Sequence, residues 1–119
     1  MEHAPDRQFS FERLELWQLA LEAVVAAHEI ADGLGRPYGA LGDQLRRAST
    51  SIGANIAEGV GKEGADQQRF FRIARGSTYE TAALVEMAAR IGRAALRQRA
   101  RIRPLLLSVA AILTTLIRR

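Results

Sequence analysis

The sequence predicts an all-α protein that folds as an antiparallel up-down four-helix bundle. Apolar residues recur at steps of three and four over four long segments, and glycine- or proline-containing breaks separate these segments. Short connections between such helices favour antiparallel neighbours. The 119 residues fit one bundle domain at 11–119 after a flexible tail at 1–10.

The first helix is expected to begin at Ser10, whose side chain can cap it, with Glu12 in the first turn. Its buried face is wide, because two apolar stripes run side by side. One stripe holds Leu14, Trp17, Leu21, Val24 and His28, and the other holds Leu16, Ala20, Ala23, Ala27 and Ile30. Gly33, Gly35 and Pro37 then end the helix.

The second helix is expected at about 38–58 and the third at about 66–93, with a Gly59–Gly61 break between them. Gly53 and Gly76 lie inside these helices, where we expect neighbouring backbones to approach closely. The inner side of the second helix should hold Leu41, Leu45, Ala48, Ile52, Asn55 and Ile56. That of the third should hold Phe70, Ile73, Ala74, Ser77, Leu84, Met87 and Ile91.

The fourth helix is expected to start near Arg101, because Pro104 is harmless only in a first helical turn. Apolar residues then cover a wide arc, which is typical of a helix buried on more than one side. The uncharged stretch 104–117 is too short for a membrane span, so a buried helix is the interpretation.

Charge is distributed unevenly along a chain whose net charge is +4. Residues 1–34 carry seven acidic and two basic side chains, whereas residues 88–119 carry eight arginines and no acidic side chain. Such asymmetry indicates either a nucleic-acid surface or complementary ends that pair within or between bundles.

Three segments carry a resemblance to a known family: FERLELWQLA at 11–20, QLRRASTSIGANIAEGVG at 44–61 and FFRIARGSTYE at 70–80. They resemble the bacterial four helix bundle protein family, also called the ribosomal-RNA intervening-sequence protein family, over about 11–119. The resemblance implies a ring-like homo-oligomer, a pentamer, with RNA, DNA or a nucleic-acid-handling protein as partner. It implies no established activity. The arginine-rich segment LRQRARIRP at 96–104 departs from the acidic segment of many relatives.

Polar residues of the second and third helices form a candidate site: Arg46, Arg47, Asn55, Glu58, Arg72, Arg75 and Glu80. If these helices form a hairpin, Arg47 lies near Glu80, Ser51 or Asn55 lies near Arg75 or its neighbours, and Glu58 lies near Arg69. Directional Arg–carboxylate pairs would then fix the register of the two helices. A structural polar lock is therefore the preferred interpretation, and a partner or ligand site is the alternative.

A positive cap is predicted at one end of the bundle from Arg90, Arg93, Arg97, Arg99, Arg101 and Arg103. Arginines that neutralise phosphates would bind nucleic acid with a steep salt dependence. All seven aromatic residues precede Arg97, so the segment offers no base-stacking platform. The alternative is that residues 97–103 meet the acidic first helix of a neighbouring subunit.

The sequence lacks the residue patterns of metal sites, nucleophilic catalytic sites and phosphate-binding loops. The chain has no cysteine, and His3 and His28 do not follow a glutamate at the spacing of a di-iron bundle. No serine has a histidine nearby in sequence, and Gly59–Lys62 lacks the spacing of a phosphate-binding loop. We therefore expect no enzyme activity, no catalytic residue, no metal and no cofactor. The N-terminal residues lack a secretion signal, which favours the cytoplasm and no membrane partner.

These features predict a non-enzymatic, homo-oligomeric scaffold that binds RNA or another nucleic acid through a basic surface. A protein–protein adaptor without nucleic-acid binding is the alternative.

Overall fold

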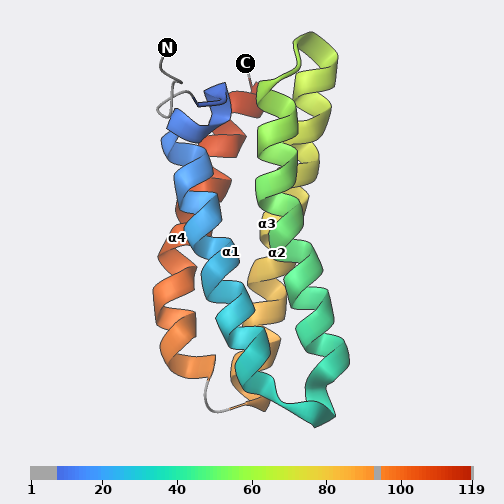
Figure 1. Cartoon of the computed structure of the whole chain (residues 1–119), viewed down its shortest axis with the longest axis vertical. Coiled ribbons are helices and arrows are strands. Elements are labelled where there is room, and N and C mark those ends of the chain that lie inside the picture. The colour runs from blue at the N-terminus through green and yellow to red at the C-terminus, as the bar shows by residue number, and fades with distance from the viewer. Residues whose placement is uncertain (1–7, 93–94, 119) are drawn as a thin grey trace, which may run out of the picture.

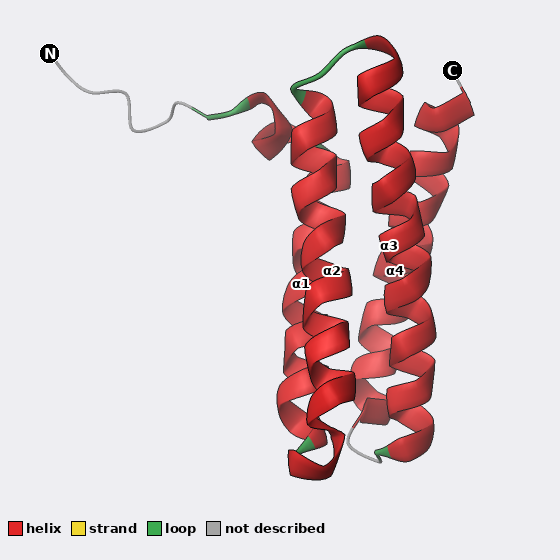
Figure 2. Cartoon of the chain, turned by 90° about the vertical axis from the view of Figure 1, so that its right-hand side faces the viewer, coloured by secondary structure: helices red, strands yellow, loops and turns green. Residues whose placement is uncertain are grey.

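The computed structural model describes residues 8–92 and 95–118, which form four α-helices and two 3-10 turns. The helices are α1 (Glu15–Leu34), α2 (Gly39–Val60), α3 (Gly64–Ile91) and α4 (Ala95–Arg118). Each helix runs antiparallel to the next and packs against two neighbours, α1 on α2 and α4, and α3 on α2 and α4 (Figures 1 and 2). The predicted all-α up-down bundle is confirmed. Of the predicted tail, residues 1–7 lie outside the described residues.

The first helix begins later than predicted, at Glu15, and Ser10 does not cap it. Ser10 instead starts a 3-10 turn, η1 (Ser10–Arg13), in which the Phe9 N–H donates to Glu12 Oε1 at 2.7 Å. The chain then becomes extended at Leu14. Phe11 packs edge-on against Trp17, with ring centroids 4.9 Å apart, so an aromatic contact folds this turn back onto α1.

The break between α1 and α2 lies where the glycines and proline predicted it. α1 ends at Leu34, and Gly35 follows with φ +84° and ψ −179°, a conformation that favours glycine. Pro37 lies in the short η2 turn (Arg36–Tyr38), which leads directly into α2. Local backbone preferences therefore set this reversal of the chain.

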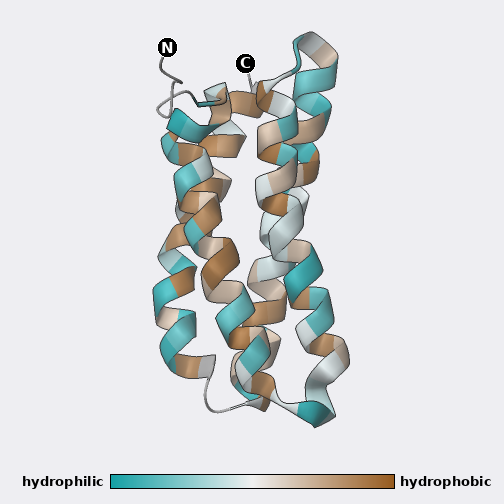
Figure 3. Cartoon of the chain, in the orientation of Figure 1, coloured by the Kyte–Doolittle hydropathy of each residue, from teal (hydrophilic) through white to brown (hydrophobic). Residues whose placement is uncertain are grey.

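Core side chains come from all four helices. Leu45, Ile52 and Ile56 of α2 are fully buried, as are several alanines of α1, including Ala20 and Ala23. The second predicted stripe of α1 is thus the core stripe, whereas Leu14 and Leu21 of the first are 38% and 40% exposed. Hydrophobic segments recur along α1 and the upper part of α4, and α4 becomes hydrophilic toward its beginning (Figure 3).

The inner face of α3 was predicted wrongly in part: Ile73, Met87 and Ile91 are 40–52% exposed. Thr78 and Thr81 are buried instead. Their hydroxyls donate to the Ala74 and Ser77 carbonyls at 2.8 and 2.7 Å, so burial leaves neither hydroxyl without a partner. Hydrophobicity alone misidentified this face because self-satisfied threonines can take core positions.

The predicted close approaches at Gly53 and Gly76 are also corrected. A Cβ on Gly76 would meet nothing within 4 Å, and one on Gly53 would make only ordinary contacts of 3.9–4.0 Å. The tight approach is at Gly59, where a Cβ would lie 2.7 Å from Cε1 of Phe71. The bulky phenylalanine of α3, rather than a second small residue, therefore requires a glycine on α2.

The fourth helix begins at Ala95 rather than near Arg101, so Pro104 lies in its interior. Residues 95–103 are rich in Ala, Leu, Arg and Gln, which favour helix, and fully buried Ile102 anchors them. Pro104 leaves the Ala100 carbonyl without its helical N–H partner. Ala100 is exposed, so water can bond that carbonyl.

Candidate nucleic-acid interface

An arginine cap lies at the end of the bundle where α3 passes into α4. It consists of the described arginines Arg90, Arg97, Arg99, Arg101 and Arg103. The connection between α1 and α2, with exposed Arg36, lies at the same end (Figure 1). Arg93, also predicted for this cap, lies outside the described residues. Arg99 was expected to precede the fourth helix, but it lies on α4 together with Arg103, and the helix fixes their spacing.

Two arginines of the cap share one carboxylate. Arg99 Nε donates to Glu86 Oε2 at 2.8 Å, and Arg103 Nη1 donates to the same oxygen at 3.2 Å. The hydrogen bond from Arg99 is the main reason that the pKa of Glu86 lies below its ordinary value of 4.5. Glu86 in turn raises the pKa of Arg99. One carboxylate cannot neutralise two guanidinium groups, so this cluster stays positive.

Arg101 points the other way around α4, toward α1. Its Nη1 donates to Glu29 Oε1 at 2.6 Å, between side chains that are each about half exposed. The sequence left open whether the segment would meet the acidic first helix of a neighbouring subunit. Within the single chain, Arg101 pairs with the chain's own first helix. This ion pair ties the start of α4 to the later part of α1.

The cap keeps an excess of positive charge. Arg90 and Arg97 are exposed, and within residues 8–92 and 95–118 neither forms an ion pair. The five described arginines of the cap thus face two carboxylates, Glu29 and Glu86. Such a surface can hold phosphates without first breaking every internal pair.

The polar residues of the predicted lock do not pair as expected across α2 and α3. Arg46 binds Asp32 at 2.6 Å and Asp43 at 3.1 Å, so it joins α2 to α1. The hydrogen bond that Arg46 donates to Asp32 is the main reason that the pKa of Arg46 is raised. Arg47 and Glu80 are both exposed, and the described part of the chain shows no ion pair between them.

Two other residues of the predicted lock, Glu58 and Arg75, also have partners other than the predicted ones. Glu58 lies 3.6 Å from Lys62, one turn along the chain, and Arg69 pairs with Asp66 rather than Glu58. Arg75 reaches Thr114 of α4 at 3.4 Å. Arg72 is exposed. The partner or ligand role that was the alternative for this set stays a prediction.

Small hydroxyl groups make the polar contact between α2 and α3. The Ser51 and Ser77 hydroxyls lie 2.8 Å apart, and the Asn55 amide donates to Ser51 Oγ at 2.9 Å and to the Ser51 carbonyl at 2.8 Å. The sequence predicted that Ser51 or Asn55 would lie near Arg75 or its neighbours, and the contact is made by Ser77, two residues from Arg75.

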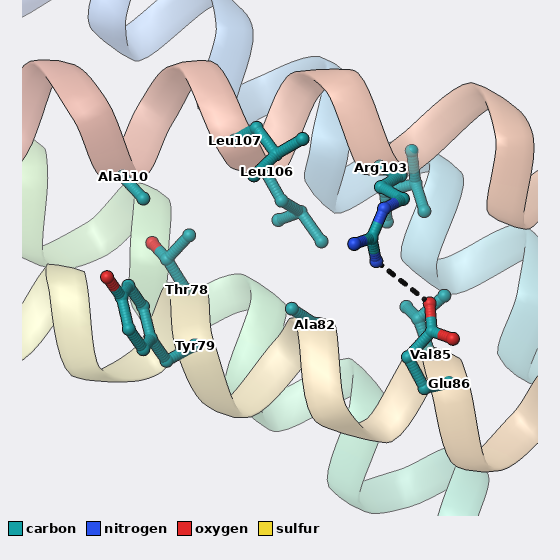
Figure 4. A pocket seen from close by; sticks show the side chains of 10 residues that line it. Thr78, Tyr79, Ala82, Val85, Glu86, Arg103, Leu106, Leu107 and Ala110 are labelled. Atoms are coloured by element: carbon teal, nitrogen blue, oxygen red, sulfur yellow. Dashed lines mark hydrogen bonds and ion pairs between the residues drawn. The ribbon is translucent and has the colours of Figure 1, made fainter.

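A groove between α3 and α4 was missed by sequence reasoning. It has a volume of about 330 Å³, and Figure 4 shows Tyr79 and Ala110 at one end and the Arg103–Glu86 pair at the other. Its lips carry Tyr79 and Leu107, which are 63% and 61% exposed. The only signal in the sequence was the wide apolar arc of α4.

α4 is less buried than predicted. Leu96–Ile117 is long and apolar enough, by length and composition, to cross a membrane, yet only 22% of its most apolar window is buried. Ion pairs hold the helix to α1 and α3. On the inner side, Ile102, Val109 and Leu113 are fully buried. α4 is thus a bundle helix with an outer face that is also apolar.

The described residues contain no group of three or more His, Asp or Glu side chains that could hold a metal ion. His28 is half-buried, and its Nδ1 lies 2.9 Å from the Val24 carbonyl, to which it can donate. The contact gives one ring nitrogen of His28 a partner within its own helix.

Comparison with known families identifies the chain. The sequence profile of the 23S rRNA-intervening sequence protein matches residues 12–115. The chain belongs to this family. The match covers α1, α2 and α3 completely and nearly all of α4, so the family resemblance seen in the three motifs extends over the bundle. No curated protein sequence matches the chain significantly.

Proposed function

We propose that this 23S rRNA-intervening sequence protein is a non-enzymatic, self-associating scaffold, pentameric in solution, that binds RNA through its arginine cap. The observation that carries the proposal is the uncompensated charge of the cap, in which Arg99 and Arg103 share the single carboxylate of Glu86. Exposed Arg90 and Arg97 flank that cluster. The family description names ribosomal RNA, which makes RNA the first nucleic acid to test.

Binding by this surface is expected to follow the phosphate backbone rather than base sequence. Guanidinium groups bind phosphate oxygens directionally and release condensed counterions. The arginine-rich segment 96–104 contains no aromatic side chain for base stacking. Weak sequence preference and strong salt dependence are therefore the expected properties.

Self-association would multiply this charge. Each chain carries a net charge of +4, so five copies together carry +20. A ring that placed the five caps on one side would present a continuous positive surface to one RNA molecule. Several weak contacts on one ligand raise its overall affinity well above that of a single cap.

The proposal is tested by titrating structured RNA and duplex DNA against the protein at low and moderate salt. Arg90→Ala/Arg97→Ala removes two exposed charges without stranding a paired carboxylate. We expect it to weaken RNA binding by about tenfold or more and to reduce the salt slope by about 2 per chain. Arg13→Ala/Arg72→Ala is the matched control, because it also removes two exposed charges but leaves the cap intact.

Two results would count against RNA binding. A wild-type protein that shifts neither RNA nor DNA at low salt would leave a protein-only adaptor as the better function. The internal pairing of Arg99, Arg101 and Arg103 is the observation that favours this second candidate. Equal weakening by both double variants would show that overall charge, and not the cap, attracts RNA.

A further inference from the structure

The groove between α3 and α4 is apolar along most of its length. Val85, Ile102 and Leu106 are buried and form its floor, and Tyr79 and Leu107 stand exposed along it (Figure 4). Its volume of about 330 Å³ lies at the lower end of the range for sites that hold small ligands. The groove can therefore take a flat apolar group without a change in the core.

A cluster of arginines lies at one end of this groove. Arg99 and Arg103 donate to the same oxygen of Glu86 at 2.8 and 3.2 Å. Arg90 follows Glu86 by four residues, so both lie on one face of α3. Arg90 is exposed, and it has no ion pair among residues 8–92 and 95–118. Three guanidinium groups against one carboxylate leave this end positive, so it attracts an anion despite the presence of Glu86.

An aromatic side chain lies at the other end of the groove. Tyr79 precedes Glu86 by seven residues, so the two share a face of α3 and lie about 10.5 Å apart along the helix. The Tyr79 side chain is 63% exposed, and it stacks on no other aromatic ring in the part of the chain that the structure describes. An exposed ring can serve as a platform for a nucleobase, because every base has a π-face.

The arginine cluster and the ring fit the two parts of a single strand of nucleic acid, its phosphates and its bases. In a duplex the bases are paired and stacked inside, so only an unpaired segment can bring a base onto Tyr79. The span of about 10.5 Å is about three times the axial rise of about 3.4 Å per phosphate in one strand of a duplex. A few unpaired nucleotides therefore reach from one end of the groove to the other.

We infer that the α3–α4 groove binds an unpaired segment of RNA, with phosphates at Arg99 and Arg103 and one base against Tyr79. Such a site presupposes the RNA binding proposed above and specifies which RNA the protein prefers. The arginine-rich segment has no aromatic side chain of its own, and the fold supplies one from α3. Stacking tolerates all four bases, so the preference is for an unpaired segment and not for a sequence.

The test compares two hairpin RNAs with the same stem, one fully paired and one with a bulge of unpaired uridines. We expect the wild type to bind the bulged RNA about tenfold more tightly. Tyr79→Leu should remove this preference with unchanged circular dichroism, because the side chain is exposed, whereas Tyr79→Phe should keep it. Tyr38→Leu is the matched control, since Tyr38 is the other tyrosine of the chain, is exposed and lies outside the groove.

Photo-cross-linking locates the bound base independently of affinity. 4-Thiouridine is placed in the bulge, the complex is irradiated, and the cross-linked peptide is identified by mass spectrometry. We expect the cross-link at Tyr79 or Leu107, which stand exposed along the groove.

The outcomes separate the groove from the arginine cap. Equal binding of the two RNAs, by a wild type whose binding Arg90→Ala/Arg97→Ala weakens, would overturn the groove site and leave phosphate binding by the cap. A preference for the bulge that survives Tyr79→Leu, or a cross-link outside α3 and α4, would also overturn the groove site. A wild type that binds neither RNA at low salt would overturn the proposed RNA binding as well.

Discussion

Gly59 of α2 packs directly against Phe71 of α3. A Cβ there would lie 2.7 and 2.8 Å from two ring atoms of Phe71 and 3.2 Å from the Cβ of Phe70. We expect Gly59→Ala to destabilise the fold by about 1–3 kcal/mol, because the buried ring must move and the packing of the two helices with it. Urea unfolding followed by circular dichroism measures the change.

Gly76 provides the control for that prediction. It lies inside α3, and a Cβ would meet nothing within 4 Å. Gly76→Ala should therefore raise the free energy of unfolding by about 0.5–1 kcal/mol, since alanine loses less backbone entropy on forming helix. Opposite signs for the two substitutions are the expected result, and equal effects would contradict the close approach at Gly59.

Protonation of Glu86 would weaken its ion pairs with two arginines of the cap. Its pKa is lowered in the folded chain, first by the hydrogen bond from Arg99, so its ion pairs stabilise the fold above its ordinary pKa of 4.5. This contribution is lost as the pH falls through the lower folded pKa. We expect Glu86→Gln to melt below wild type at neutral pH, and the two melting temperatures to converge once the pH falls below the lowered pKa of Glu86 in the folded chain.

Glu80 on the same helix is the comparison for Glu86. It is exposed and forms no ion pair with a described residue. Glu80→Gln should therefore follow the wild-type melting temperature at every pH. A pH-independent difference between Glu86→Gln and wild type would show that the two arginine contacts do not depend on the charge of Glu86.

At the scale of a helix, the beginning of α4 is part of the bundle and not a loop. Ile102 is fully buried among the arginines of the cap, whereas Leu96, about 1.7 turns earlier, is 57% exposed. We expect Ile102→Ala to cost about 2–5 kcal/mol through the cavity that it leaves. Leu96→Ala should change the free energy of unfolding by less than about 0.5 kcal/mol.

The same comparison probes how the cap is held. If Ile102→Ala and Leu96→Ala had equal, small effects on unfolding, then the first turns of α4 would not be packed against the core. Hydrogen exchange of the amides from 98 to 103 gives a local measurement. Protection in wild type that is selectively lost in Ile102→Ala would locate the effect in this part of the helix.

At the scale of the whole molecule, self-association should make stability depend on concentration. An assembly that binds folded but not unfolded chains raises the unfolding temperature as protein concentration increases. We expect a rise of about 5 °C or more over a hundredfold range for wild type. Differential scanning calorimetry of the protein over that concentration range measures the change. A wild-type temperature that does not vary would contradict assembly.

Much of the architecture could be predicted because helices and their ends are set by local chemistry. The spacing of apolar residues located four helices, and Gly35 with Pro37 marked the first reversal of the chain. In these segments the local preferences agree with the global fold, so they can be read from the sequence. The uneven distribution of charge likewise follows directly from the order of residues.

The sequence by itself therefore determined the fold class, the breaks and the existence of an arginine-rich end. Only the tertiary structure decided which stripe of each helix is buried and which carboxylates the arginines meet. Thr78 could replace Ile73 in the core because its hydroxyl bonds the preceding turn. Arg101 pairs with Glu29, 72 residues away. Such choices depend on the surfaces that neighbouring helices offer, and periodicity along one helix does not contain that information.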